Sequence, residues 1–400
     1  MQFGFTYSTG FRAPYGNFEI SPSFCNFAIS TLINIVGADI VMTGRSKILI
    51  TLFSLLLIAV GVLTCYAYHS ESGVSDAPDG TKKLSVAYIQ DKGNTLPAPD
   101  LYDALIYAFA EFNDNNDGLV LLHPERIRAI ADLKLQNPSL KVILGVGGEK
   151  YEGFSEMGAD AKKRKRFAKS CKQIIDSLNL DGVDLDWEFP GTTTGGHSAG
   201  PDDVENYILI VKQLRKTLGK KSWISFYSNN SGGFIDLKGM VPYVTYVNVS
   251  GYNLATAKDG KLKAHQSNLY SSDRYGDWSV DKAVARHIKL GVPRNKILLG
   301  IPFYAWADKA HNTFMYDYSI PVKFKGESEK WDDKALVPYY DDNDGTLTGS
   351  FDNTRSIAIK GDYIRKKGLA GGFIFPYEAD YPDQRLSKAL RESLKLHPTN

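Results

Sequence analysis

The chain has 400 residues, and its fractions of 43% hydrophobic and 23% charged residues are those of a globular protein. A formal net charge of +2 gives no reason to expect a nucleic acid or an acidic partner. Of the three cysteines only Cys171 lies beyond residue 68, so the main part of the chain can form no internal disulfide.

The first residues of the chain differ from the rest in composition. Residues 1–41 are aromatic, nearly uncharged and without clear periodicity, and Met42 stands directly before TGRSK and an apolar run, as a start codon would. We therefore expect residues 1–41 to be an N-terminal extension without functional content.

An uncharged run from Ile48 to Tyr68 follows. As a helix it would be about 31 Å long, enough to cross a bilayer. Arg45 and Lys47 precede it, which favours an inside N-terminus and an exported, outward-facing remainder. The sequence therefore predicts a membrane partner: residues 42–68 form a signal anchor or, since VLTC ending at Cys65 loosely resembles a lipoprotein box, a lipoprotein signal. Whether the segment is cleaved stays open. The polar residues 69–83 are predicted to be a tether.

From Leu84 onward, strand-like and helix-like segments alternate. Strand candidates begin at residues 84, 103, 141, 180, 222, 244, 296 and 368, and several are continuous apolar runs, as in buried parallel strands. Helical patterns lie between them, with start signals at Pro124, at Asp202 or Asp203 and at Ser279, and another helix is predicted over 356–367. The basic run at 162–166 opens a helix whose inner face includes Cys171, so it indicates a solvated helix face. This alternation predicts an α/β fold, a single (β/α)8 TIM barrel over residues 84–395. An open doubly wound sheet is the alternative, but GVGG at Gly145 lacks the spacing of its phosphate-binding loop.

One strand candidate carries three acids on alternate positions. In DGVDLDWEFP, residues 181–190, Asp184, Asp186 and Glu188 share one face of a strand, and apolar residues occupy the other. Same-face neighbours lie about 6.6 Å apart, so at least one carboxyl should hold a proton near neutral pH. A barrel places catalytic groups at the C-terminal ends of its strands, which puts Glu188 at the mouth. A solvated edge strand is the alternative.

These residues resemble the signature of family 18 glycoside hydrolases, in its chitinase-like branch. Further motifs match the family in order: VAYIQ at 86, YAFAEF at 107, KVILGVGG at 141, VSGYN at 249, GIPFY at 300 and GLAGGFIF at 368. The resemblance implies that Glu188 is the general acid, that Asp186 orients the substrate's 2-acetamido group, that Asp184 shares a proton with Asp186 and that Tyr252 holds the acetamido group. It also implies a sugar site formed by Tyr88, Phe109, Gly148, Asn253, Tyr304, Trp306 and Phe375.

The sequence departs from the family pattern at several site positions. Gly145 stands in place of Ser, Glu149 in place of Trp, Ser250 and Asn253 in place of Met and Asp, Trp306 in place of Arg, and Phe375 in place of Trp. The segment between Tyr304 and Gly368 is too short for the full α+β domain that many chitinases insert there, which predicts a shallower cleft. These departures concern substrate contacts more than the chemistry.

The resemblance implies a glycosidase that cleaves β-1,4 bonds at N-acetylglucosamine, in chitin or its oligomers, by retaining, substrate-assisted catalysis. Two alternatives stay open: an endo-β-N-acetylglucosaminidase acting on the chitobiose core of N-glycans, and a carbohydrate-binding protein without turnover. We expect a monomer with no nucleic-acid partner, no cofactor and no metal. The loops at Asn113 and Asp341 do not complete a calcium-binding pattern, and the seven histidines form no zinc motif.

Overall fold

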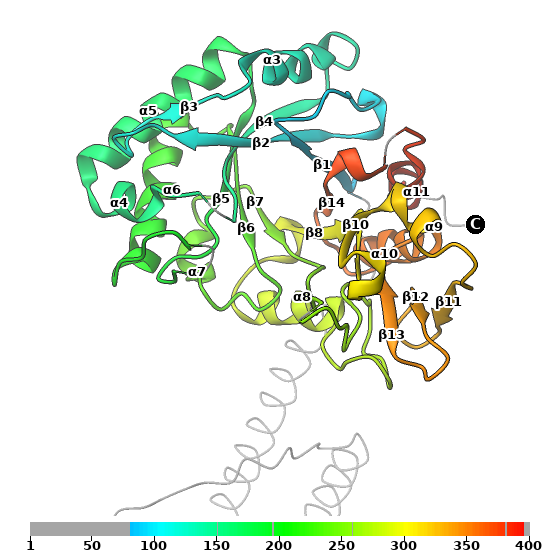
Figure 1. Ribbon diagram of the computed structural model, residues 1–400. Helices are drawn as coiled ribbons and strands as arrows, with labels where there is room; N and C mark the ends of the chain where they lie inside the picture. The colour runs from blue at the N-terminus through cyan, green and yellow to red at the C-terminus, as the bar shows by residue number, and fades with distance from the viewer. Residues whose placement is uncertain (1–80, 150, 194–195, 258, 381, 396–400) are drawn as a thin grey trace, which may run out of the picture. The chain divides into compact units, whose positions relative to one another are not determined.

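Eight parallel strands form a closed barrel. The computed structural model describes residues 81–395 except 150, 194, 195, 258 and 381, all of them in one compact unit, Asp76–Asn400 (Figure 1). Each barrel strand pairs with the next in the order β1-β2-β4-β5-β6-β7-β8-β14, and β14 pairs back with β1. The strands are β1 Leu84–Gln90, β2 Ala104–Phe112, β4 Lys141–Gly147, β5 Gly182–Asp186, β6 Trp223–Ser228, β7 Tyr246–Val249, β8 Ile297–Pro302 and β14 Gly371–Phe375. The predicted barrel and all eight strand positions are confirmed.

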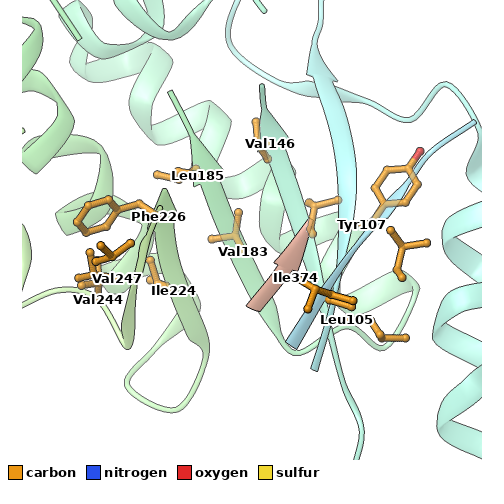
Figure 2. Packing of buried hydrophobic residues seen from close by; sticks show 14 of the residues in the cluster. Leu105, Tyr107, Val146, Val183, Leu185, Ile224, Phe226, Val244, Val247 and Ile374 are labelled. Carbon is orange, nitrogen blue, oxygen red and sulfur yellow. The ribbon is translucent and has the colours of Figure 1, made fainter. Parts of the chain in front are cut away.

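The two faces of each strand belong to different packing layers because side chains alternate along a strand. Outward residues such as Val183, Leu185 and Phe226 pack between the barrel and its helices, as Figure 2 shows. Inward residues such as Tyr88 and Phe373 fill the barrel. The alternation in β5 therefore turns Asp184 and Asp186 into the barrel and Trp187 outward, against Phe154 and Tyr207.

The helices α3 and α8 begin where the sequence signals predict: Pro124 occupies the first turn of α3, and the Ser279 side chain accepts from the Lys282 N–H at the start of α8. The helix predicted over 356–367 begins two residues earlier, at Thr354, where Asn353 forms a capping box with Ser356. The helices are α3 Pro124–Asp132, α4 Phe154–Ala159, α5 Ala161–Ser177, α6 Asp203–Leu218, α7 Leu237–Met240, α8 Val280–Lys289, α10 Thr354–Lys366 and α11 Arg385–Ser393. Short 3-10 helices cover Pro99–Leu101, Leu133–Leu135, Arg294–Lys296, Lys309–His311, Asp317–Ser319 and Tyr377–Asp380. A two-residue strand β3, Leu119–Val120, extends the sheet beyond β2. The basic run lies on α5, whose buried residues include Cys171, as predicted.

A small sheet is inserted between β8 and α10. Its five antiparallel strands have the order β10-β9-β13-β12-β11, and a one-turn helix α9, Ile320–Lys323, packs in its core (Figure 1). The strands are β9 Tyr304–Ala307, β10 Phe314–Tyr316, β11 Lys330–Asp332, β12 Val337–Asp341 and β13 Leu347–Ser350. The short segment therefore still builds an α+β insertion, because strands of three to five residues are enough for a five-stranded sheet. The sequence predicts that this segment is too short for a full α+β domain, yet it forms a five-stranded sheet and a one-turn helix.

A second chain segment braces this insertion. Residues 254–279, which connect β7 to α8, run beside it: the Gln266 side-chain amide donates to the Tyr304 carbonyl at 2.7 Å and the Ser267 hydroxyl donates to Asp352 at 2.7 Å. Further contacts join His265 Nε2 to Asp332 at 3.3 Å and the Tyr275 hydroxyl to Asp341 at 3.2 Å. One wall of the barrel mouth is thus built from two segments of the chain.

A buried ion pair joins the end of the insertion to the barrel. Lys360 and Asp352 are both fully buried, and Lys360 Nζ lies 2.7 and 2.6 Å from the two Asp352 oxygens. Burial lowers the pKa of Lys360, and the Asp352 charge opposes that shift. The Ser356 hydroxyl also donates to Asp352, so the carboxylate is well satisfied.

We expect Lys360→Met to lower the free energy of unfolding by about 3–5 kcal/mol, because it leaves the Asp352 charge buried without its partner. Urea unfolding measures the change. Lys366→Met removes an exposed lysine from the same helix and should stay within about 0.5 kcal/mol of the wild type. A loss below about 1 kcal/mol for Lys360→Met would contradict the importance of the pair.

The expectations for the N-terminal part of the chain concern residues that the structure does not describe. The extension 1–41, the signal segment 42–68 and most of the tether 69–83 lie outside the described residues. Among the helices that are described, none has the length and apolarity needed to cross a membrane.

Candidate active site

Asp184 lies at the bottom of the site, fully buried inside the barrel. It accepts hydrogen bonds from the Tyr88 hydroxyl at 2.7 Å, the Ser225 hydroxyl at 2.5 Å and the Asn248 amide at 2.9 Å. Burial raises the pKa of Asp184 to about 6, and these three donors limit the rise. Asp184 is therefore positioned from three different strands.

Asp186 and Glu188 lie above Asp184, towards the mouth. Asp186 is 6% exposed, and among the described residues its Oδ1 has no hydrogen-bond partner. Burial, followed by the charges of Glu188 and Asp184, raises the pKa of Asp186 well above its usual range. Burial, followed by the charge of Glu149, raises the pKa of Glu188 to about 8. These raised pKa values agree with the expectation that at least one of the three carboxyls holds a proton near neutral pH.

Glu188 follows the strand rather than belonging to it. The ladder of β5 ends at Asp186, so the three acids do not all lie on the strand as expected. His197 Nε2 lies 2.6 Å from the Glu188 carbonyl oxygen, and the Asp203 carboxylate accepts from the N–H groups of Gly191 and Gly200 at 3.1 and 2.8 Å. These contacts hold the loop that carries Glu188.

The glycines of β4 allow the strand to pass close to its neighbours. A Cβ added at Gly145 would lie 2.3 Å from the Tyr107 carbonyl oxygen, so the family's serine cannot fit here without a shift of β2. Gly147 and Gly148 have φ values of +112° and +106°, which favour glycine. The Gly148 N–H donates to the Asp186 carbonyl at 2.8 Å, so Gly148 lies beside the acids.

Aromatic rings surround the acids. Phe375 is partly exposed at the end of β14, with its ring centroid 6.0 Å from that of Tyr88 and 6.5 Å from that of Tyr304. Tyr252 is buried among Tyr227, Tyr304 and Phe373. Tyr88 is 1% exposed, so it lies deeper than expected for a sugar contact and supports Asp184 instead.

Asn253 joins two of the predicted sugar-site residues. It is exposed and adopts a φ of +52°, a conformation that asparagine tolerates. Its Oδ1 accepts from the Tyr304 hydroxyl and from Trp306 Nε1, each at 2.8 Å. Trp306 is therefore fixed with its ring at the edge of the site. Trp278 Nε1 donates to the Asn230 side-chain oxygen at 3.1 Å, and the Asn230 amide donates to the Asn253 carbonyl at 3.3 Å.

Two further rim residues complete the site. Phe109 is partly exposed, with its ring centroid 6.2 Å from that of Tyr88 and 6.4 Å from that of Tyr151. Glu149 is exposed directly after Gly148, so a carboxylate occupies the position where many chitinases have Trp.

Some residues of this site were not predicted. Ser225 and Tyr227 on β6 and Asn248 on β7 face into the barrel, and the alternation of their strands is a signal that could have identified them. His197 and Asp203 contact the Glu188 loop from outside any strand; the sequence marks Asp203 only as a helix start signal, and no pattern marks His197. Within the described residues, no three His, Cys, Asp or Glu side chains are grouped so that they could hold a metal ion.

Comparison with known proteins identifies relatives along most of the chain. The chain is 28% identical to chitinase A1 of Niallia circulans, in an alignment that covers 83% of this chain and 50% of that protein, so the chain spans about half its length. It is 26% identical to chitotriosidase-1 of Mus musculus, covering 74% of this chain and 73% of that protein.

Solved structures with this fold are also similar. A family 18 N-acetylglucosaminidase from Paenibacillus barengoltzii matches with a TM-score of 0.71 at 26% identity, over 78% of this chain and 99% of that one. The chitinase domain of the spore coat protein CotE from Clostridium difficile matches with a TM-score of 0.58 at 30% identity, over 80% of this chain and 95% of that one. The model of the glycosyl hydrolases family 18 matches residues 67–380. With the barrel, the three acids and this match over most of its length, the chain belongs to glycosyl hydrolase family 18.

Proposed function

We propose that the protein is a glycosidase that hydrolyses β-1,4 bonds at N-acetylglucosamine, in chitin or its oligomers, with retention of configuration. The observation that carries the proposal is the arrangement of Asp184 and Asp186, which are buried on β5, and of Glu188, which is half-buried directly after the end of that strand. The relatives named as chitinases support the substrate class.

Glu188 is the proposed general acid. A group that protonates a glycosidic oxygen must hold a proton at the working pH, and burial provides this by raising the pKa to about 8. Within the described residues no hydrogen bond occupies the Glu188 carboxyl, so its proton is available to the leaving-group oxygen.

The attack on the anomeric carbon is proposed to come from the substrate's own acetamido oxygen. Asp184 is fully buried and already accepts hydrogen bonds from Tyr88, Ser225 and Asn248, so its carboxylate is not available as a nucleophile. The unpartnered Oδ1 of Asp186 is suited to accept the acetamido N–H as positive charge develops on the cyclic intermediate. Tyr252 is proposed to hold the acetamido group from the opposite side. Water then opens the intermediate, with Glu188 acting as base, and the configuration is retained.

The proposal is tested with substrates that differ only at the 2-position of the cleaved sugar. Chitin oligomers should be hydrolysed, and proton NMR should show the β-anomer as the first product. Oligomers with a free amine or a hydroxyl in place of the acetamido group should not turn over. Efficient cleavage of the hydroxyl analogue would overturn substrate assistance. Release of sugar from a high-mannose glycopeptide, with chitin oligomers left intact, would favour action on N-glycans instead.

The alkaline limb of the pH–activity profile should depend on the charge of Glu149, because that charge raises the pKa of Glu188. Activity requires protonated Glu188, so kcat/KM should fall as the pH rises through about 8. Glu149→Gln removes a negative charge that raises the Glu188 pKa, so the alkaline limb should move to lower pH. Glu125→Gln removes an exposed charge on α3 and should leave the limb in place. A limb that stays fixed in Glu149→Gln would contradict the assignment.

The uncharged run Ile48–Tyr68 is proposed to be a membrane anchor or lipoprotein signal that leaves the barrel outside. The run, preceded by Arg45 and Lys47, supports the proposal on sequence grounds alone. We also propose the boundaries 42–68 for this segment, 69–83 for a tether and 84–395 for the catalytic domain. Protease added to intact cells should digest the barrel, and protection until lysis would overturn the outward orientation.

A further inference from the structure

The solvent side of helix α5 carries five basic side chains. They recur at the spacing of one helix face and are all exposed: Lys162, Lys165, Arg166, Lys169 and Lys172. The helix as a whole contains seven cations and one anion, although the chain has a formal net charge of only +2. The rest of the chain is therefore net negative, and positive charge is concentrated on this side of α5, here called the basic face.

Most of the basic face has no partner within the protein. Arg166 pairs with Asp117 at 2.6 Å. Lys172 pairs with Asp176, one turn later in the same helix, at 2.7 Å. The other three side chains, all lysines, form no ion pair with any residue that the structure describes. Their charges are therefore available to a partner outside the barrel.

The basic face opposes the electrostatics of its own helix. A helix is stabilised by acids in its first turn and by basic residues in its last turn, and α6 follows this rule at both ends. Helix α5 has no acid in its first turn and no basic residue in its last turn, and Asp160 caps it from outside. Like charges three or four residues apart also repel each other along the basic face. Helix stability therefore does not explain these lysines, and a local rule broken without a packing reason indicates a function.

The place of α5 in the barrel leaves the mouth accessible. The helix connects β4 to β5, and the inserted sheet follows β8, so the two lie on opposite sides of the barrel (Figure 1). An outer helix lies along the strands, whereas the mouth is at the C-terminal ends of the strands. A flat surface that contacts the basic face would therefore leave the candidate active site open to substrate.

The charge and surroundings of the basic face select its partner. A row of exposed lysines attracts an extended anionic surface, and lysines close to anionic lipid headgroups add to membrane binding one by one. The proposed anchor, residues 48–68, ends just before the tether 69–83, which spans at most about 50 Å when fully extended. The bilayer that holds the anchor is thus the anionic surface within reach of the barrel.

We propose that the basic face of α5 docks the barrel on anionic lipid headgroups of the membrane in which the anchor is held. The barrel then lies on its side, with its mouth open along the membrane surface. This inference rests on the proposed anchor and is independent of the proposed reaction.

The experiment measures how close the barrel lies to the lipid. The full chain is mixed with vesicles of phosphatidylcholine, with or without phosphatidylglycerol, that carry an energy acceptor on a headgroup. All five tryptophans of the chain lie at residue 187 or later, so energy transfer from them reports on the barrel alone. We expect transfer to be stronger with phosphatidylglycerol and to fall to the level of the neutral vesicles as salt is raised from about 0.05 to about 0.5 M, because salt screens the attraction.

A double charge reversal separates docking from folding. Lys162→Glu together with Lys165→Glu should lower the ratio of docked to undocked barrels about 30-fold or more. The same variant should unfold at a higher temperature than the wild type, because the new carboxylates lie near the helix N-terminus and four residues before Arg166 and Lys169. Loss of docking combined with a gain in stability is not expected of residues that only support the fold.

The matched control reverses two exposed lysines elsewhere. Lys366→Glu on α10 together with Lys388→Glu on α11 changes the net charge by the same amount and should leave the energy transfer unchanged. An equal loss of transfer in this control would mean that net charge, and not the basic face, attracts the barrel, and the inference would be wrong.

The remaining outcomes keep the proposals distinguishable. Equal transfer with both kinds of vesicle, or a lower unfolding temperature in the α5 variant, would overturn the inference. Binding of duplex DNA without lipid-dependent transfer would assign the basic face to nucleic acid instead. Release of the wild-type chain from all vesicles at high salt would contradict the anchor, and transfer that depends on phosphatidylglycerol at low salt would still support the basic face. Hydrolysis of chitin oligomers by the α5 variant should stay at the wild-type rate, so the reaction is tested separately.

Discussion

Glu188→Gln should reduce kcat on chitin oligomers by a factor of about 10²–10⁴, because the amide cannot supply the proton that the leaving-group oxygen needs. The folded structure should be unaffected, since the Glu188 carbonyl, and not its side chain, contacts His197. Thermal unfolding should therefore give the wild-type midpoint, and chitohexaose should still bind. A single-turnover assay with a fluorescent oligomer gives the rate.

One control variant accompanies this prediction. Glu205→Gln changes an exposed acid on α6 and should keep wild-type rates. If added azide or formate restores most of the activity of Glu188→Gln, the residue is needed as the base that activates water, and not as the acid that protonates the leaving group. Half of the wild-type rate in the variant would sink the assignment of the acid.

Asp186→Asn should lower kcat by a factor of about 10²–10³, the usual result of removing one group that stabilises charge in the transition state. The substitution preserves size, and Asp186 Oδ1 has no hydrogen-bond partner among the described residues, so the fold loses no contact of that atom. A thiazoline mimic of the cyclic intermediate should lose affinity in parallel with kcat, because both report the same interaction. Steady-state kinetics and inhibition by the mimic check the two effects together.

Asp176→Asn provides the matched control for Asp186→Asn. Asp176 is an exposed acid on α5, paired with Lys172 one turn earlier, and its replacement should leave both kcat and the inhibition constant unchanged. If Asp186→Asn lowers kcat while the mimic binds as tightly as before, Asp186 does not contact the acetamido group. In that case its effect would come from the charge it places beside Glu188.

The barrel could be predicted because its signals are local. Each barrel strand is a short apolar run, and β5 shows its alternation within a few residues, so the sequence alone was enough to place Asp184 and Asp186 on one face. The helix starts at Pro124 and Ser279 could be predicted because proline in the first turn and serine at the N-cap are recognised from the residue type alone. Closure of the barrel then follows from eight such units.

The inserted sheet could not be predicted from the same signals. Its strands β10 and β11 have three residues each, too few to show a period, and they are defined by pairing with strands elsewhere in the segment. The contacts of Asp184 with Tyr88 and Asn248 likewise join residues 96 and 64 positions apart in the chain. Which polar residues meet inside the barrel depends on strand register, and the sequence does not state the register.

The braced wall of the barrel mouth has a consequence for protein engineering. Because the segment 254–279 hydrogen-bonds to the insertion at Tyr304, Asp332 and Asp352, neither segment carries all the partners of its own polar groups. Consider a chimera that receives only the residues between β8 and α10 from another member of the family. The donors that remain in 254–279, such as Gln266 and Ser267, would then lose their matching acceptors in the insertion. Recombination that aims to exchange cleft shape should therefore move both stretches together as a single transplantable unit.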